Sequence, residues 1–160
     1  MSSIRHRAIQ GLAVGDAFSV TRTFTALDVE RFADISRDFN PVHFDDRFAC
    51  AKKLSAVICH GLLVAGMITE IGGQIGWLAS GMNFHFIQPV FIDDTITCTF
   101  TIEEIEKRGR AHGKAVYTNQ RNELVLQATL KGILPGPVER HVMQAMVAEG
   151  DPTNRRPGTG

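Results

Sequence analysis

The residues best suited to chemistry in this chain are a carboxylate and an imidazole that flank an Asn-Pro turn. They lie in the segment Asp38-Phe39-Asn40-Pro41-Val42-His43. An Asp and a His that share one water molecule can take a proton from it and pass a proton to a neighbouring carbon. Asn40 could orient that water or brace the imidazole by hydrogen bonding. Asp38, His43 and Asn40 are therefore the candidate catalytic residues.

A second chemical feature is the step His60-Gly61, which opens an apolar run. The first backbone N–H groups of a helix have no acceptor in a preceding turn and carry the positive end of the helix dipole. Because Gly61 has no side chain to block approach, its N–H can meet a carbonyl oxygen and stabilise negative charge there. Gly61 is therefore the candidate oxyanion-binding residue.

These candidates also have purely structural interpretations. Asp38 and Asn40 before Pro41 make a stable turn without any catalytic purpose, and a single histidine is often structural. The other histidines lack the spacing and carboxylate partners of a metal site, so we expect no bound metal. The cysteines form no CxxC pair and are interpreted as small buried thiols in a reducing compartment; they are Cys50, Cys59 and Cys98.

The first half of the chain predicts one strand followed by helices. Residues 15–24 are typical of a strand, and Thr25-x-x-Asp28 has the spacing of a helix N-terminal capping box. That helix must end before Pro41, because proline disfavours helical geometry at the preceding residue. A short helix is expected within residues 44–54. Residues 60–73 are apolar nearly all round, which predicts a buried helix.

The second half of the chain changes to a period of two. Ile96, Cys98, Phe100 and Ile102 alternate with threonines, and three further runs repeat the pattern. Four such runs predict a meander of antiparallel strands, each with one face to bury, and the helix at 60–73 would cover that face. The expected fold class is α+β. The four runs are 82–86, 95–102, 111–117 and 124–130.

Length and composition indicate one soluble domain with flanking segments. The chain has 160 residues, of which 44% are hydrophobic, and this suffices for a single core. We interpret residues 1–14 as a loosely held leader and residues 15–135 as the domain. Residues 136–160 are interpreted as a tail with a helical turn or two at 139–148 and ten disordered residues at its end.

The charge balance and the apolar runs exclude two classes of partner. Lys and Arg number 17 and so do Asp and Glu, whereas a sequence-blind nucleic-acid binder is usually basic. No apolar run reaches the ~18 residues that a membrane span needs. The N-terminus also lacks the apolar core of a secretory signal. We therefore expect a cytoplasmic protein without nucleic-acid or membrane partners.

The chain resembles the MaoC-like hydratase family, which includes the (R)-specific enoyl-CoA hydratases. The resemblance extends from about Gly15 to Leu134, and its most specific element is the hydratase motif followed by His-Gly. The matching motifs are Phe24-Thr25-x-x-Asp28-Val29-x-x-Phe32-Ala33, Asp38-x-Asn40-Pro41-x-His43, Phe48-Ala49, Ile58-x-His60-Gly61-Leu62 and Phe86-x-x-Pro89-Val90.

This resemblance implies a hot-dog fold, in which an antiparallel sheet wraps a central helix. It implies a homodimer with sheets joined edge to edge and active sites near the interface, and it allows larger assemblies. It further implies that Asp38 and His43 form the catalytic pair, that Asn40 supports them and that the Gly61 N–H binds the thioester oxygen. The implied reaction is reversible addition of water to a trans-2-enoyl-CoA, giving an (R)-3-hydroxyacyl-CoA without a cofactor.

The chain also departs from the family pattern. Where the family commonly has Ser-Gly-Asp, this chain has Arg37 in the middle position. The arginine could restrict the backbone or reach a phosphate of the substrate. The basic candidates for such contacts are Arg37, Lys52, Lys53, Arg108 and Arg110.

Three alternative functions use the same fold. The same acid–base pair would serve a 3-hydroxyacyl-carrier-protein dehydratase. A non-catalytic acyl-thioester-binding subunit would have a vestigial site. A thioesterase would release free CoA from a saturated acyl-CoA, although no motif in the chain suggests it.

Overall fold

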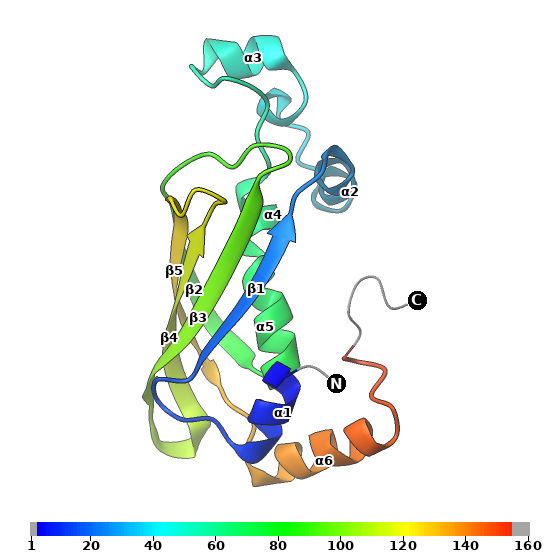
Figure 1. Ribbon diagram of the computed structural model, residues 1–160, viewed down its shortest axis with the longest axis vertical. Coiled ribbons are helices and arrows are strands. Elements are labelled where there is room, and N and C mark those ends of the chain that lie inside the picture. The colour runs from blue at the N-terminus through cyan, green and yellow to red at the C-terminus, as the bar shows by residue number, and fades with distance from the viewer. Residues whose placement is uncertain (1–2, 155–160) are drawn as a thin grey trace.

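The computed structural model describes residues 3–154, and its centre is an antiparallel sheet wrapped around one helix (Figure 1). The sheet has five strands in the order β1-β3-β4-β5-β2. This arrangement confirms the predicted α+β class and the hot-dog fold. The strands are β1 (Ala17–Thr23), β2 (Leu78–Phe86), β3 (Thr95–Ile105), β4 (Arg110–Thr118) and β5 (Leu124–Ile133).

The predicted alternation in the second half of the chain is confirmed in β3. Its apolar residues Ile96, Cys98, Phe100 and Ile102 are all buried, while the threonines between them are half-buried on the other face. Period-two burial of this kind is what a sheet with one face on the core requires.

The predicted four-strand meander is wrong in one connection. β3, β4 and β5 are neighbours in sequence order, but β2 pairs with β5 rather than with β3. The reason is that β1 occupies the other edge of β3, with Phe18 opposite Phe100, so β2 takes the remaining edge beside β5. The connection over residues 87–94 therefore crosses from one edge of the sheet towards the other.

The predicted buried helix is confirmed, but Gly66 divides it in two. α4 spans Gly61–Ala65 and α5 spans Met67–Ile75. The Tyr117 hydroxyl donates a hydrogen bond of 2.8 Å to the Ala65 carbonyl at this division. The core forms where α5 lies against the sheet, with Ile71 and Ile75 fully buried.

The helices between β1 and α4 stand beyond one end of the sheet (Figure 1). They are α2 (Ala26–Ser36), the 3₁₀ turn η1 (Pro41–His43) and α3 (Asp46–Ala51). The predicted capping box is confirmed, because Thr25 accepts from the Asp28 N–H and the Asp28 carboxylate accepts from the Thr25 N–H. This backbone hydrogen bond from Thr25 is the main reason that the pKa of Asp28 is lowered.

The N-terminal segment differs from the predicted loose leader. Residues Ser3–Gln10 form α1, whose Ile4 and Ala8 are buried. Arg5 lies 3.5 Å from Asp151, with both side chains only 5% exposed, and it also donates to the Gly73 carbonyl. No sequence pattern predicts this ion pair, because its partners lie near opposite ends of the chain.

The C-terminal segment is also more ordered than predicted. α6 spans Pro137–Ala148, so the helix is longer than the expected turn or two, and it buries Met143. Asp151 is buried although the last ten residues were expected to be disordered. The remainder of that expectation, for residues 155–160, lies outside the described residues.

The cysteine prediction is confirmed for two residues and wrong for one. Cys59 and Cys98 are buried, and burial raises the pKa of each thiol to about 12, which suits an inert structural role. Cys50 is exposed on the short helix α3, which has only one buried residue. Among residues 3–154, no helix is long and apolar enough to cross a membrane.

Candidate active site

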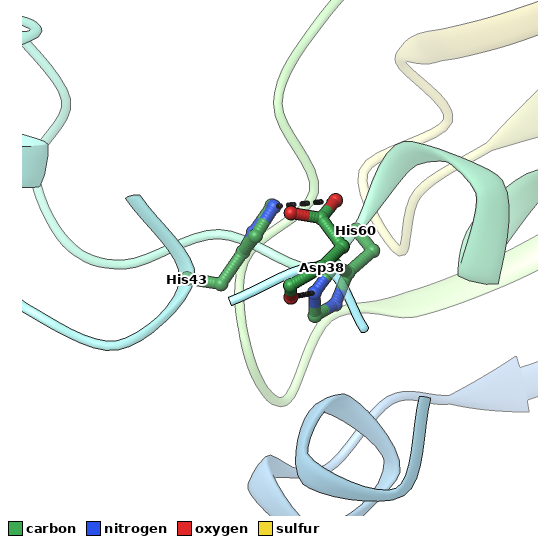
Figure 2. Close-up of side chains that lie close together, drawn as sticks. All are labelled: Asp38, His43 and His60. Carbon is green, nitrogen blue, oxygen red and sulfur yellow. Dashed lines mark hydrogen bonds and ion pairs between the residues drawn. The ribbon is translucent and has the colours of Figure 1, made fainter. Parts of the chain in front are cut away.

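The structure brings the predicted acid–base pair together, with Asp38 just before η1 and His43 at its last position (Figure 2). The Nε2 atom of His43 lies 3.8 Å from the Oδ2 atom of Asp38. The His43 side chain is 8% exposed, whereas that of Asp38 is 50% exposed. A buried imidazole therefore faces a carboxylate that remains open to water.

A backbone contact fixes the tautomer of His43. Its Nδ1 atom lies 2.8 Å from the Ile58 carbonyl oxygen. Because a carbonyl oxygen only accepts, Nδ1 must carry the hydrogen and donate it. In the neutral ring the lone pair is then on Nε2, the atom that faces Asp38.

The surroundings of His43 favour the neutral imidazole. Burial is the largest cause of a lowered pKa, and the neighbouring His60 lowers it further. The hydrogen bond to Ile58 and the charge of Asp38 act in the opposite direction but do not outweigh the burial. His43 can therefore accept a proton from a water molecule at neutral pH.

Hydrogen bonds within the loop shape the segment that carries Asp38. The Asp38 N–H donates to the Ser36 hydroxyl, and the Asn40 N–H donates to Asp38 Oδ1, each over 3.2 Å. The amide oxygen of Asn40 accepts from the Val42 N–H and thereby caps η1. This contact ties the Asn40 oxygen to the backbone of the turn, and the support of the catalytic pair by Asn40 stays a prediction.

His60 belongs to this cluster as well, although the sequence analysis treated it only as the residue before Gly61. Its ring is stacked on that of His43, with centroids 3.8 Å apart and planes inclined by 29°. Its Nε2 atom lies 2.8 Å from the Asp38 carbonyl oxygen (Figure 2). The His-Gly step marks its position in the sequence, but only the folded chain places it against the segment that carries Asp38.

A cavity of about 370 Å³ opens beside His43 and reaches the start of α4 at Gly61. A Cβ atom added to Gly61 would lie 2.7 Å from the ring of Phe86, so the glycine is needed for this close approach. Most of the wall is apolar, as a pocket for an acyl group would be. It is made by Val64, Phe86, Ile87, Pro89, Val90, Val125 and Leu126.

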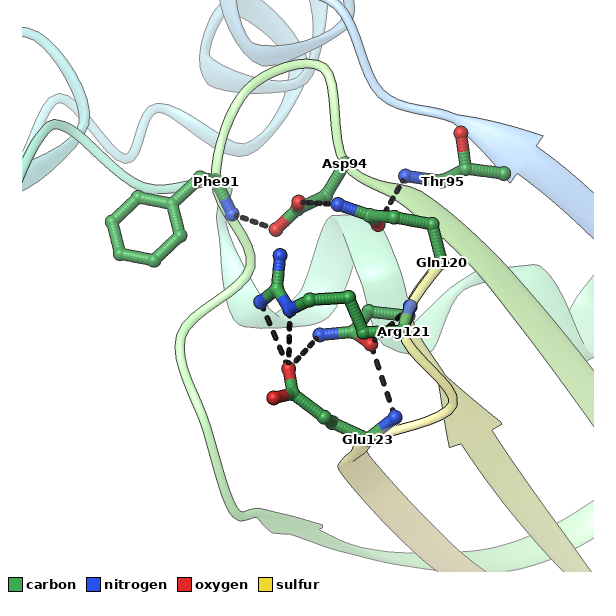
Figure 3. Close-up of polar contacts among 7 residues, drawn as sticks. Phe91, Asp94, Thr95, Gln120, Arg121 and Glu123 are labelled. Atoms are coloured by element: carbon green, nitrogen blue, oxygen red, sulfur yellow. Dashed lines mark hydrogen bonds and ion pairs between the residues drawn. The ribbon is translucent and has the colours of Figure 1, made fainter.

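The segment 91–95, which follows the cavity-lining residues 87–90, is hydrogen-bonded to the β4–β5 turn (Figure 3). Asp94 accepts from the Phe91 N–H over 2.8 Å and from the Gln120 amide over 2.6 Å. Gln120 in turn accepts from the Thr95 N–H. Next to this network, the Val90 carbonyl accepts from the Cys59 N–H, and Phe91 forms an antiparallel bridge with Ile58, whose carbonyl accepts from His43.

The turn itself is closed by a second group of contacts (Figure 3). Glu123 accepts from the Asn119 side chain over 2.7 Å and from Arg121 over 2.9 Å. The hydrogen bond from Asn119 is the main cause of the lowered pKa of Glu123. The turn lies between the predicted strand runs 111–117 and 124–130, but its contact with Asp94 joins residues that are distant in the sequence.

Asp38, His43 and His60 are close enough together to be considered as metal ligands. Their geometry does not suit a metal, because nearly parallel stacked rings cannot both hold an ion in their planes at the usual distance of about 2 Å. We therefore interpret the cluster as an acid–base site.

The chain is similar to a known protein family and to several of its relatives. The family model described as "MaoC like domain" matches residues 14–123. The chain is 32% identical to the (R)-specific enoyl-CoA hydratase of Aeromonas caviae over 102 residues, which are 61% of this chain and 76% of that protein. A solved (R)-hydratase from A. caviae, described as involved in PHA biosynthesis, has a TM-score of 0.74 at 29% identity. The match covers 79% of this chain and 99% of the A. caviae chain.

Another relative has a different substrate in its name. The mitochondrial 3-hydroxyacyl-[acyl-carrier-protein] dehydratase of Arabidopsis thaliana is 36% identical over 87 residues. The match covers 53% of this chain and 52% of that protein, so the chain spans about half of that relative's length.

Proposed function

Because the chain belongs to the MaoC-like dehydratase family, we propose that it hydrates trans-2-enoyl-CoA to (R)-3-hydroxyacyl-CoA and catalyses the reverse dehydration. The observation that carries this proposal is the position of His43, whose Nε2 lies 3.8 Å from the Asp38 carboxylate and whose side chain lines a mostly apolar cavity. A water molecule between these two groups would be oriented and deprotonated beside the bound acyl chain.

The proposed hydration begins with this water. Its oxygen bonds to C3 of the enoyl group while its proton passes to His43, and Asp38 holds the second hydrogen. The electrons of the double bond move towards the thioester oxygen, giving an enolate. The same acid–base pair then returns one proton to C2, so the net change is addition of one water.

Gly61 is proposed to stabilise the enolate. Its N–H stands at the first position of α4, where no preceding turn supplies an acceptor. A thioester oxygen placed there would gain negative charge in the transition state and receive a stronger hydrogen bond. The tight contact between Gly61 and Phe86 keeps one side of this position apolar.

Three of the basic candidates for contacts with CoA lie near the site. Arg37 follows α2, and Lys52 and Lys53 follow α3, at the end of the molecule that carries the acid–base pair (Figure 1). Arg108 and Arg110 lie at the connection from β3 to β4, at the opposite end. We propose that Arg37, Lys52 and Lys53 attract the phosphates of the substrate.

We also propose a homodimer joined through β2. This strand is at the edge of the sheet, and within residues 3–154 its one neighbouring strand is β5. Its apolar side chains Leu78, Met82 and Phe86 are exposed, which is unusual for an unprotected edge strand in a monomer. A dimer formed there would lie close to Phe86 and hence to the cavity. Light scattering after gel filtration tests this state.

Hydration of crotonyl-CoA, followed by chiral analysis of the product, tests the proposed reaction. We expect loss of the enoyl-thioester absorbance and an (R)-3-hydroxy product. Release of free CoA from a saturated acyl-CoA would instead indicate a thioesterase. Tight binding of acyl-CoA without turnover would indicate a non-catalytic subunit.

The similarity to the plant dehydratase favours one second candidate, in which the acyl group is carried by a carrier protein. The acid–base chemistry would be the same, and only contacts outside the cavity would differ. Comparing the rates for the CoA and carrier-protein forms of one acyl chain separates the two. If the rate with the carrier-protein form were more than about tenfold higher, equal to about 1.4 kcal/mol, the carrier-protein thioester would replace the CoA thioester as the proposed substrate.

A further inference from the structure

The geometry points to His60 as a positioning residue that holds the Asp38 loop and the His43 ring in their reactive arrangement. This inference rests on the proposed function for its consequence in catalysis. The contacts of His60 with Asp38 and His43 are present without any substrate. His60 acts through Asp38 and His43 and is not placed among the groups that touch the reacting atoms.

The first contact is a hydrogen bond to the backbone of Asp38. His60 Nε2 is 2.8 Å from the Asp38 carbonyl oxygen, and since that oxygen only accepts, Nε2 carries the hydrogen. The bond fixes the peptide that follows Asp38. A rotation of that peptide would move the carboxylate relative to His43 Nε2.

Little else anchors this peptide. The Asp38 side chain is half exposed, and the next residue, Phe39, is 61% exposed. The other hydrogen bonds of Asp38, with Ser36 and Asn40, are made within the loop and do not connect it to the core. His60 is 1% exposed and thus provides a fixed point in the interior.

The second contact is the stacking on His43. The two imidazole rings lie 3.8 Å apart, and Phe32 packs on His60 with its ring centroid at 5.0 Å. With its Nδ1 bound to Ile58, the His43 ring is held at one nitrogen and along one face. Such support restricts rotation of Nε2 away from Asp38.

A role in packing alone would not explain why a polar histidine is buried at position 60. Its Nδ1 atom is buried and has no hydrogen-bond partner among residues 3–154. An unsatisfied buried acceptor is unfavourable, and a phenylalanine would fill a similar space without it. The donor on Nε2, which reaches Asp38, is the feature that a phenylalanine would lack.

Two substitutions separate the ring from the hydrogen bond. His60→Phe keeps an aromatic ring against His43 but removes the donor, whereas His60→Gln keeps an N–H donor but removes the ring. His141→Phe is the matched control, because His141 is exposed on α6, far from the site. Each variant is assayed for kcat and KM with crotonyl-CoA and for thermal unfolding.

We expect His60→Phe to lower kcat about 10- to 100-fold while KM changes less than about threefold, because misplaced groups weaken the chemical step more than binding. His60→Gln should recover part of kcat, and His141→Phe should match the wild type. A kcat within twofold of the wild type in both His60 variants would overturn the inference. The inference would also be overturned if His60→Phe and His60→Gln lost kcat and thermal stability to the same extent, with no recovery of kcat in His60→Gln.

Nuclear magnetic resonance keeps the inference testable if a variant fails to fold or if the wild type does not hydrate crotonyl-CoA. In the wild type, ¹⁵N shifts of the His60 ring should show the hydrogen on Nε2; a hydrogen on Nδ1 would rule out the bond to Asp38. Amide exchange at Asn40 and His43 should be faster in His60→Phe than in His141→Phe. Unchanged exchange would also reject the positioning role, whereas loss of hydration alone would reject only the proposed reaction.

Discussion

Asp38 and His43 face each other across 3.8 Å, with the carboxylate half exposed and the imidazole almost completely buried. The two groups thus differ in solvation although they stand on one short turn. The exposed member can exchange water with the solvent, while the buried member is kept neutral by its surroundings. This asymmetry suits the proposed reaction, in which Asp38 orients a water molecule and His43 takes a proton from it.

The lowered pKa of His43 predicts where activity is lost on the acid side. An imidazole whose pKa is lowered remains neutral at a pH at which an ordinary histidine, with a pKa of about 6.5, is already half protonated. We therefore expect kcat/KM for crotonyl-CoA to be constant near neutrality and to fall with a midpoint below about pH 6.5.

An NMR titration of the His43 ring supplies the control for this pH dependence. The ring should titrate below the ordinary range in the free enzyme, as the kinetics do. A kinetic midpoint at or above the ordinary value of about 6.5 would show that His43 is not the base, or that it is not desolvated as the structure indicates.

Substitution of Gly61 tests the proposed oxyanion position. In Gly61→Ala the new Cβ would lie 2.7 Å from a ring atom of Phe86. Because that atom belongs to the outer part of a flexible ring, which can shift, we expect little loss of stability but obstruction at the thioester oxygen. The expected fall in kcat/KM is about 100-fold, as for removal of an oxyanion donor.

Gly73→Ala is the matched control for that substitution. Gly73 lies on the same central helix system, in α5, and an added Cβ would meet nothing within 4 Å. Its activity should equal that of the wild type. Similar activities for Gly61→Ala and Gly73→Ala would contradict the role of the Gly61 N–H.

Sequence reasoning was most successful where a feature is local. The capping box at Thr25, the alternation in β3 and the acid–base motif of Asp38 and His43 all depend on residues within a few positions of one another. Local hydrogen bonds and burial patterns have a fixed spacing, so they are visible in the sequence. The packing of Asp38 against His43 was expected because a short turn separates them.

Features that depend on distant partners were missed. The contact of His60 with the Asp38 carbonyl, and the ion pair of Arg5 with Asp151, join segments that no periodicity connects. The place of β2 beside β5 was missed for the same reason, since edge choice depends on which strand already occupies β3. These pairings are set by tertiary packing rather than by local propensity.

The backbone of Arg37 predicts a change in both stability and substrate binding. Arg37 ends α2 in the left-handed region, with a φ of 60°, where a side chain is unfavourable. Arg37→Gly should raise the free energy of unfolding by about 0.5–1 kcal/mol, which chemical denaturation can measure. If Arg37 attracts the CoA phosphates, KM should rise in the same variant.

Arg108→Gly separates these two effects. Arg108 also has a φ near 60°, namely 61°, and carries the same charge, but it lies at the opposite end of the molecule. It should show the gain in stability without the rise in KM. Equal KM values in the two variants would remove Arg37 from the proposed CoA contacts.

The ion pair between α1 and the C-terminal segment predicts a loss of stability without a loss of chemistry. Arg5→Met keeps most of the apolar stem but leaves Asp151 buried without its cation. We expect the free energy of unfolding to fall by about 3 kcal/mol, as for other broken buried pairs, while kcat is unchanged. Denaturation followed by fluorescence of Trp77 measures the effect.

Arg7→Met is the control on the same helix. Arg7 pairs with Asp16 over 2.9 Å, but the Arg7 side chain is 38% exposed, and exposed pairs contribute about 0–1 kcal/mol. A similar loss in both variants would show that burial of the Arg5 pair has no special importance for stability.

The most direct test of the account is the initial rate of crotonyl-CoA hydration by the wild type and by Asp38→Asn, measured beside their thermal unfolding. We predict that the wild type forms the (R)-product and that the variant unfolds at a similar temperature, because the Asp38 side chain is half exposed. The variant should be at least about 100-fold slower, the range expected for an acid–base group. A wild type without hydration, or a folded variant less than about tenfold slower, would contradict the assignment.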